Sequence, residues 1–166
     1  MNAKPTIIVT GASSGIGAYA ARALTADGWR VFATVRRNED RTPLEAEGIE
    51  TFIMDYTKAE TIHALVEGVL ARTGGTLDAL YSNGAYGQAG AVEDITTDVL
   101  RLQFETNFFG WHELTRAIVP VMRAQGHGRI VQCSSILGLV PYPWRGAYNA
   151  LQVCARSTHR HHGDGA

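Results

Sequence analysis

The sequence has few cysteines, no surplus of charge of either sign and no long apolar run. Its 166 residues carry 15 Lys and Arg against 16 Asp and Glu, so no basic surplus is available to neutralise nucleic acid phosphates or anionic lipid headgroups. The apolar runs are far shorter than the roughly 20 residues that cross a bilayer, and the N-terminal residues do not have the pattern of a signal peptide. We therefore expect a cytoplasmic protein that binds neither nucleic acid nor membrane.

The sequence also contains no cysteine or histidine pattern typical of a metal site. Cys133 and Cys154 are the only cysteines, and their surroundings show neither C-x-x-C nor the spacing of a zinc site. Cys133 follows an apolar run and is interpreted as an inert thiol. His159 and His162 stand one helical turn apart in the polar C-terminal run, but the pattern there predicts no helix to hold them. We expect no metal site.

What the sequence does contain is an alternation of short apolar runs with segments of helical spacing. Five runs are interpreted as buried strands, at 6–10, 30–35, 49–55, 77–83 and 128–135. A long helical stretch from about Thr97 to Met122 is interrupted near Asn107. This alternation on short connections predicts an α/β fold with a doubly wound parallel sheet, the Rossmann fold. We expect it to be truncated after the fifth strand, with one dinucleotide-binding domain over 1–150 and a disordered polar tail over 151–166.

A glycine-rich turn, "TGASSGIG", lies between the first strand and the first helix. Gly11, Gly15 and Gly17 permit a tight turn and let backbone N–H groups approach a pyrophosphate at the positive end of the helix. A turn with a purely structural role is the alternative. Its position between a strand and a helix favours the phosphate-binding interpretation.

The spacing T-G-x-x-x-G-x-G resembles the short-chain dehydrogenase/reductase family, and further landmarks follow in the family's order over residues 6–150. Asp55 matches the acidic residue that the family places near the adenine. "SNGAYG" resembles the family's N-N-A-G segment, with Asn83 retained, Ser82 in place of the first asparagine, and the Ala-Gly order inverted. Asn107 matches the helix asparagine, and Ser135 precedes Tyr148 by 13 residues, as the family's serine precedes its tyrosine.

The resemblance implies both a cofactor site and a catalytic group. The cofactor site would comprise Gly11, Ser13, Ser14, Gly15, Ile16, Gly17, Arg36, Asp55 and Asn83, and the catalytic group Asn107, Ser135 and Tyr148. The implied reaction is NAD(P)-dependent hydride transfer between a carbonyl and an alcohol. Because negative charge develops on the carbonyl oxygen, that oxygen needs a hydrogen-bond donor and an acid. By resemblance Ser135 is the donor and Tyr148 the acid, while Asn107 kinks its helix and holds a water of the proton relay.

Each of these residues also has a structural interpretation. Ser135 would close a strand end, Tyr148 would be a packed aromatic ring, and Asn107 would be an amide on the helix surface.

The end of the second strand bears on the choice of cofactor. Enzymes that use NAD usually carry an acidic residue there, whereas this sequence has Val35 followed by Arg36 and Arg37. A guanidinium binds a 2′-phosphate through charge-assisted hydrogen bonds. We therefore expect NADP(H) to be preferred over NAD(H), with a solvated loop as the alternative interpretation of the two arginines.

The substrate is expected to be a hydrophobic alcohol or ketone. The residues expected near its pocket are mostly apolar or aromatic: Tyr86, Gln88, Leu137, Val140, Pro141 and Trp144.

The family pattern fails after Ala150. The family has a lysine four residues after the tyrosine, and this sequence has Gln152, whose neutral amide cannot supply the lysine's charge. One permitted set of codons for residues 151–166, read from the second base, gives Ser-Lys-Phe-Ala-Leu-Glu-Ala-Leu, which has helical spacing and restores the lysine. We interpret the tail as a frame-shifted remnant.

Two consequences follow from this interpretation. We expect turnover to be impaired or absent, and a family-type homodimer or tetramer becomes doubtful. An NADP(H)-binding module without catalysis, and a product that does not fold stably, are the alternatives.

Overall fold

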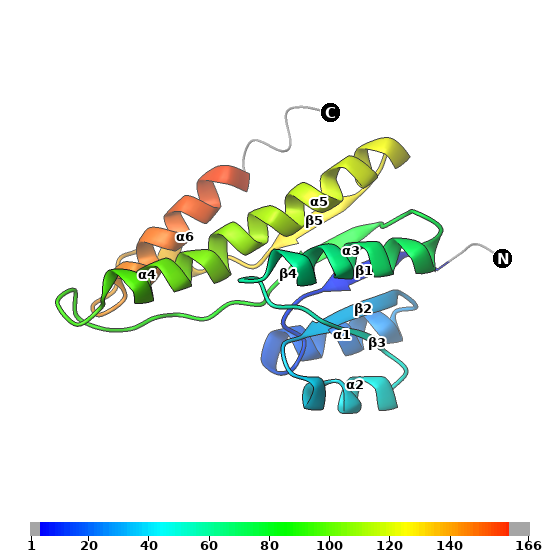
Figure 1. Ribbon diagram of the computed structural model, residues 1–166, viewed down its shortest axis with the longest axis horizontal. Coiled ribbons are helices and arrows are strands. Elements are labelled where there is room, and N and C mark those ends of the chain that lie inside the picture. Colours follow the sequence, from blue (N-terminus) through cyan, green and yellow to red (C-terminus); the bar gives the residue numbers. More distant parts are fainter. Residues whose placement is uncertain (1–3, 160–166) are drawn as a thin grey trace.

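A parallel sheet forms the centre of the molecule in the computed structural model, which describes residues 4–159 (Figure 1). Its strands are β1 (Thr6–Val9), β2 (Arg30–Val35), β3 (Glu50–Ile53), β4 (Ala79–Ser82) and β5 (Arg129–Gln132). The spatial order is β3-β2-β1-β4-β5, and every pairing is parallel. The prediction of a doubly wound α/β sheet is confirmed. Because β2 and β4 lie on opposite sides of β1, the strand order reverses there, which is where such folds bind ligands.

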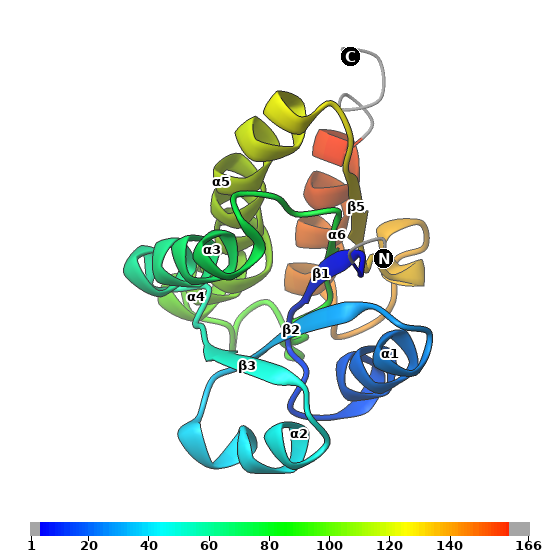
Figure 2. The ribbon, with the colours of Figure 1, turned by 90° about the vertical axis from the view of Figure 1, so that its right-hand side faces the viewer.

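Helices cover both faces of the sheet (Figure 2). They are α1 (Gly15–Ala26), α2 (Thr42–Ala46), α3 (Ala59–Thr73), α4 (Thr97–Phe104), α5 (Gly110–Gln125) and α6 (Gly146–His159), with short 3-10 turns η1 (Asn38–Asp40) and η3 (Ile136–Gly138). A π-helical turn, η2 (Glu105–Phe109), joins α4 to α5. The predicted long helix with an interruption near Asn107 is therefore confirmed, and the interruption is a π turn, a feature frequent at functional sites.

Two apolar clusters hold the layers together. Ile8, Phe32 and Leu80 point from the sheet toward α3 and α5, where they pack with Leu65 and Leu114. On the other face, strand residues pack with Ala21 of α1 and with Leu44 of α2. Side chains alternate between the two faces along β1, and all four of its residues are buried. This explains the uninterrupted apolar run "IIV" at the start of the sequence.

Helix α6 corrects the predicted disorder of the C-terminal tail. The helix continues past Ala150 to His159, so the prediction is wrong for residues 151–159. Leu151 and Ala155 are buried and stand one helical turn apart, which lets the polar run contribute an apolar contact to the core. The remaining tail, including His162, lies outside the described residues.

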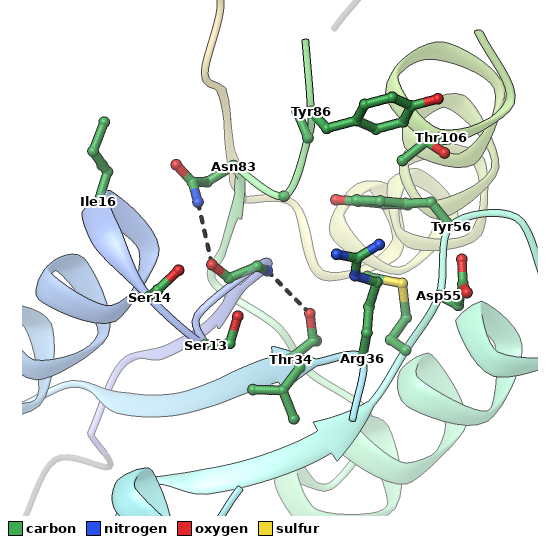
Figure 3. A pocket seen from close by; sticks show the side chains of 15 residues that line it. Ser13, Ser14, Ile16, Thr34, Arg36, Asp55, Tyr56, Asn83, Tyr86 and Thr106 are labelled. Atoms are coloured by element: carbon green, nitrogen blue, oxygen red, sulfur yellow. Dashed lines mark hydrogen bonds between the residues drawn. The ribbon is translucent and has the colours of Figure 1, made fainter. Parts of the chain in front are cut away.

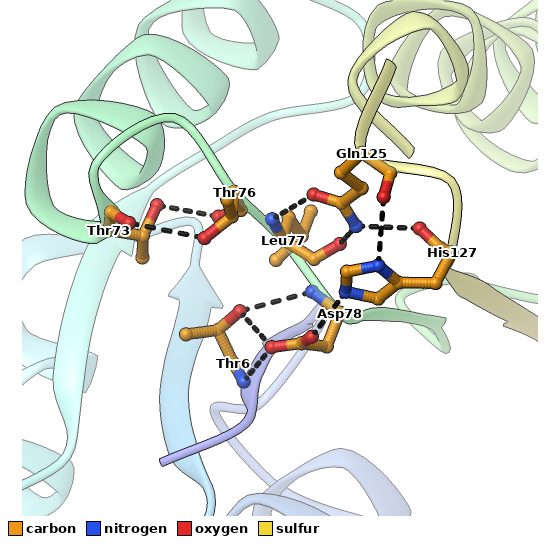
Figure 4. A network of polar contacts seen from close by, with 7 residues as sticks. All are labelled: Thr6, Thr73, Thr76, Leu77, Asp78, Gln125 and His127. Atoms are coloured by element: carbon orange, nitrogen blue, oxygen red, sulfur yellow. Dashed lines mark hydrogen bonds and ion pairs between the residues drawn. The ribbon is translucent and has the colours of Figure 1, made fainter. Parts of the chain in front are cut away.

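A polar network fastens the opposite end of the sheet from the strand C-termini (Figure 4). Asp78 accepts hydrogen bonds from the N–H and the hydroxyl of Thr6, at 2.7 and 2.8 Å, and its other oxygen lies 3.1 Å from His127 Nε2. Gln125 at the end of α5 binds both backbone groups of Leu77, accepting from its N–H at 3.1 Å and donating to its carbonyl at 2.7 Å. Together these bonds connect the starts of β1, β4 and β5.

Within residues 4–159, none of the helices has the length and apolar character needed to cross a membrane.

Candidate functional site

A cavity of about 320 Å³ opens at the C-terminal ends of β1, β2 and β4, where the strand order reverses (Figure 3). Of the residues expected to bind a cofactor, it is lined by Gly11, Ser13, Ser14, Ile16, Arg36, Asp55 and Asn83. The other lining residues are Thr34, Val35, Met54, Tyr56, Gly84, Ala85, Tyr86 and Thr106. The two remaining expected residues, Gly15 and Gly17, do not line this cavity but belong to the adjoining turn and helix start.

The glycines of the turn meet three different demands. Gly11 has a φ of 64°, and a Cβ there would lie 2.4 Å from Gly84 Cα, while a Cβ at Gly17 would lie 2.3 Å from the Gly11 carbonyl oxygen. These two positions exclude any side chain because the backbone segments touch. Gly15 also has a positive φ, of 56°, but a Cβ there would meet nothing within 4 Å, so its backbone faces open space.

The start of α1 is free to receive an anion. Ser14 is the N-cap, yet its side chain makes no capping hydrogen bond. The first turn of a helix carries N–H groups that have no partner within the helix, together with the positive end of the helix dipole. The uncapped N-terminus and the open backbone at Gly15 therefore fit a phosphate group.

Asp55 and Arg36, which both line the cavity, differ in the hydrogen bonds that they make. One oxygen of Asp55 accepts from the N–H and the hydroxyl of Thr57, at 2.9 and 2.8 Å, and the second oxygen has no hydrogen bond from a described residue. Arg37 is bound to Asp40 through two contacts of 2.9 Å, and these bonds hold the pKa of that carboxyl below its ordinary value. The Arg36 side chain has neither a hydrogen bond nor an ion pair within residues 4–155, and its exposed guanidinium points into the cavity beside Tyr56 (Figure 3).

The Thr10 hydroxyl connects three of the residues that line the cavity. Its hydroxyl oxygen accepts hydrogen bonds from the Tyr56 hydroxyl at 2.8 Å and from the backbone N–H groups of Asn83 and Gly84 at 2.9 and 3.2 Å. Asn83 in turn donates from its side chain to the carbonyls of Thr10 and Gly11 (3.3 and 3.5 Å). Burial raises the pKa of Tyr56 well above its ordinary value, so the phenol stays protonated and serves as a donor.

Tyr56 also explains the inverted order of glycine and alanine in "SNGAYG". A Cβ at Gly84 would lie 3.2 Å from Tyr56 Cε2 and 3.1 Å from Gly11 N. Alanine at this position would press against both the buried ring and the glycine turn. Tyr56 was missed in the sequence, where the signal was an aromatic residue directly after the expected Asp55.

Asn107 is buried in the π turn, so its interpretation as a surface amide is wrong. Its side chain binds both backbone groups of Tyr86, accepting from the N–H at 3.2 Å and donating to the carbonyl at 2.6 Å. The segment after β4 is thereby fixed to the long helix. The side-chain amide of Asn107 is engaged in this positioning contact.

Ser135 and Tyr148 are carried by neighbouring elements, and neither lines the cavity described above. The Ser135 oxygen accepts from Leu137 N at 3.2 Å as the cap of η3, which leaves the hydroxyl proton available to another acceptor. Tyr148 lies half-buried in the first turn of α6, and its hydroxyl has no hydrogen-bond partner among residues 4–155. Asn149 connects the two elements by donating to the carbonyls of Leu137 and Val140, at 2.6 and 3.0 Å.

Gln152 occupies the position where the resemblance places a lysine. It is 4% exposed and accepts a hydrogen bond from the Ser134 hydroxyl at 3.2 Å. A Cβ at Gly138 would lie 3.4 Å from Gln152 Cβ, so the side chain packs under η3. The position beneath Ser135 and Tyr148 is thus filled by a neutral amide. No group of three or more His, Cys, Asp or Glu side chains in the described part of the chain is placed to hold a metal ion.

Comparison with known proteins agrees with this arrangement. Residues 5–157 match the family model of the short chain dehydrogenases. The uncharacterized oxidoreductase YbbO of Escherichia coli is 35% identical over 145 residues, which are 87% of this chain and 54% of that protein. A short-chain dehydrogenase from Streptomyces avermitilis superposes with a TM-score of 0.89 at 36% identity, covering 95% of this chain and 58% of the other. A metagenomic short-chain oxidoreductase in complex with NADP gives 0.86 at 32% identity, covering 93% and 72%.

The chain therefore belongs to the short-chain dehydrogenase family, and the resemblance inferred from its motifs is confirmed. The chain spans about half the length of the curated relatives it matches.

Proposed function

We propose that this chain binds NADP(H) in preference to NAD(H) and descends from an enzyme that interconverts a carbonyl and an alcohol on a hydrophobic small molecule. The observation that carries the cofactor preference is the unpaired guanidinium of Arg36 at the cavity, with Val35 where a ribose-binding carboxylate would stand. A 2′-phosphate would complete the hydrogen bonding of Arg36, whereas an unphosphorylated ribose would leave it unused. The metagenomic relative named above holds NADP, which supports the proposal.

The residues around the cavity suit the parts of such a cofactor. The uncapped start of α1 and the open backbone at Gly15 would hold the pyrophosphate, Asp55 would accept from the adenine, and Arg36 would hold the 2′-phosphate. The nicotinamide, when bound, supplies or accepts the hydride.

The chain's own residues would handle the substrate oxygen. Ser135 would donate its free hydroxyl proton to that oxygen, and Tyr148 would protonate it as negative charge develops. The role of Asn107 in the proton relay remains part of the proposal. The substrate would lie by the exposed apolar and aromatic side chains between η3 and α6, which are Leu139, Val140, Tyr142 and Trp144. Trp144 holds a φ of 63°, an uncommon conformation for a bulky residue.

Turnover by this chain is proposed to be low, because Gln152 brings no charge to Tyr148. We retain the hypothesis that the sequence after Ala150 was produced by a frameshift. Sequencing the encoding DNA from the Arg145 codon onward tests it. An open second frame that continues in the family's pattern would support the hypothesis, and an early stop in that frame would refute it.

The cofactor proposal is tested by fluorescence titration of the intact chain with NADPH and with NADH. We expect NADPH to bind at least tenfold more tightly, and Arg36→Ala to reduce that ratio to near one while leaving NADH affinity unchanged. Arg37→Ala is the matched control, because Arg37 already binds Asp40. Equal affinity of the unaltered chain for both cofactors would refute the preference.

A second candidate is an NADP(H)-binding module without catalysis, favoured by the intact cavity together with the neutral amide at Gln152. Tight NADPH binding without oxidation of NADPH on a panel of apolar ketones would support it. The balanced charge of the chain gives no reason to expect a nucleic acid or membrane partner, and a family-type oligomer is not expected. The two free cysteines suit the reducing cytoplasm, where we propose the protein acts.

A further inference from the structure

Three elements bind the backbone of the segment from Tyr86 to Gln88, which follows β4. Asn107 in the π turn binds both backbone groups of Tyr86. Arg145, directly before α6, donates to the Gly87 carbonyl at 3.3 Å. Gln103 of α4 accepts from the Gln88 N–H at 2.7 Å. The segment is thus fixed residue by residue between the long helix and the helix that carries Tyr148.

The same segment separates two parts of the site. Tyr86 lines the cavity at the strand ends. Gly87 lies against Tyr148, because a Cβ at Gly87 would stand 3.6 Å from Tyr148 Cδ2 and 3.4 Å from Arg145 Nη1. A shift of the segment would therefore move the cavity wall and the packing surface of the Tyr148 ring together.

Gln103 is an unusual residue for the interior of α4. Its side chain is fully buried, its Oε1 accepts from the Gln88 N–H, and its Nε2 has no hydrogen-bond partner among residues 4–155. An unpaired buried donor is unfavourable, and a methionine of similar length would fill the same space without it. Packing alone therefore does not account for glutamine at this position.

We propose that Gln103 is a positioning residue. With Asn107 and Arg145 it holds residues 86–88 so that Tyr86 forms the cavity wall and Gly87 fixes the Tyr148 ring. This inference rests on the proposed function for the role of Tyr148, but the contact itself can be tested without turnover.

The test uses the intact chain and its Gln103→Met variant, both labelled with ¹⁵N for the amides and with ¹³C for the aromatic rings. We expect hydrogen exchange at the Gln88 amide to become at least tenfold faster and the ring resonances of Tyr148 to shift, while the melting temperature changes by less than about 4 °C. Gln125→Met is the matched control, because Gln125 holds the Leu77 backbone in the same way at the opposite end of the sheet. That variant should accelerate exchange at Leu77 and leave Gln88 and Tyr148 unchanged.

Gly87→Ala provides a second, independent variant that needs no change in the helix. The added methyl group should displace the Tyr148 resonances while the Gln88 amide stays protected. Unchanged exchange at the Gln88 amide, or unmoved Tyr148 resonances, in Gln103→Met would overturn the proposal. An unaltered chain that fails to bind NADPH would instead refute the proposed function, leaving the exchange results on the positioning contact interpretable.

Discussion

The Ser134 hydroxyl donates to the Gln152 side-chain oxygen at 3.2 Å, so a neutral pair fills the buried position below Tyr148. This pair gives the Ser134 hydroxyl an acceptor and the Gln152 side-chain oxygen a donor without introducing a charge. The helix that carries Tyr148 is therefore held by a contact that lacks the positive charge expected to assist Tyr148.

Gln152→Lys should raise turnover. A lysine one helical turn after Tyr148 would supply the missing positive charge near the phenol, and we expect at least a tenfold gain in NADPH-dependent reduction of an apolar ketone. Gln152→Met is the control, because it fills the same space without charge. Equal rates for the two variants, both saturated with NADPH, would show that the charge at residue 152 does not limit this chain.

Gly84→Ala should destabilise the fold by about 1–3 kcal/mol, as overpacked sites do. The new methyl group would meet the Tyr56 ring and the backbone of Gly11. In the Tyr56→Val background the ring is absent, so the same substitution should cost less. A double-mutant cycle by urea denaturation measures this coupling, and additive effects would indicate that Gly11 alone excludes the side chain.

Glu113 should contribute to stability in neutral solution and lose that contribution in acid. The hydrogen bond from Arg116, and to a smaller extent that from His63, lowers the pKa of Glu113 from 4.5 to about 2. Because the folded-state pKa is depressed, the contribution is fully present above about pH 4.5 and is lost as the pH falls through about 2. We expect the wild type to exceed Glu113→Gln in denaturation midpoint at pH 6, with the difference shrinking toward pH 2. A difference that does not change with pH would contradict this assignment.

Asp78→Asn should weaken the fold without affecting cofactor binding. Burial alone would raise the pKa of Asp78, but the hydrogen bonds from Thr6 and His127 outweigh it and hold the pKa below its ordinary value. Loss of these charge-assisted bonds should cost about 1–3 kcal/mol by urea denaturation. Since the network lies at the opposite end of the sheet from the cavity, NADPH affinity per folded molecule should stay within twofold. A large loss of affinity would indicate coupling along the strands.

The fold could be predicted from local patterns because its strands are short apolar runs and its turn glycines are fixed by backbone contacts. Asn107 was correctly placed at the interruption of the long helix. Its partner Tyr86 was not foreseeable, because the bond joins residues 21 positions apart through an ordinary backbone group. The contact of Tyr56 with Thr10 joins residues 46 positions apart, so local patterns do not predict it either.

For helix α6 the sequence-based prediction of disorder is wrong, although the local pattern of residues indicates the helix. The many polar residues after Ala150 obscure the spacing of Leu151 and Ala155, two buried residues one turn apart that pack this helix against the rest of the chain. In this segment the spacing of the apolar residues indicates the helix, whereas the polar composition does not.

The anchoring of α6 through Leu151 and Ala155 has an evolutionary consequence. Substitutions at the exposed positions of this helix leave that apolar contact in place, whereas substitutions at Asn149 or Gln152 remove hydrogen bonds that hold the helix to its neighbours. Neutral sequence drift would therefore concentrate on the exposed face of the helix, while its buried positions stay under selection for packing.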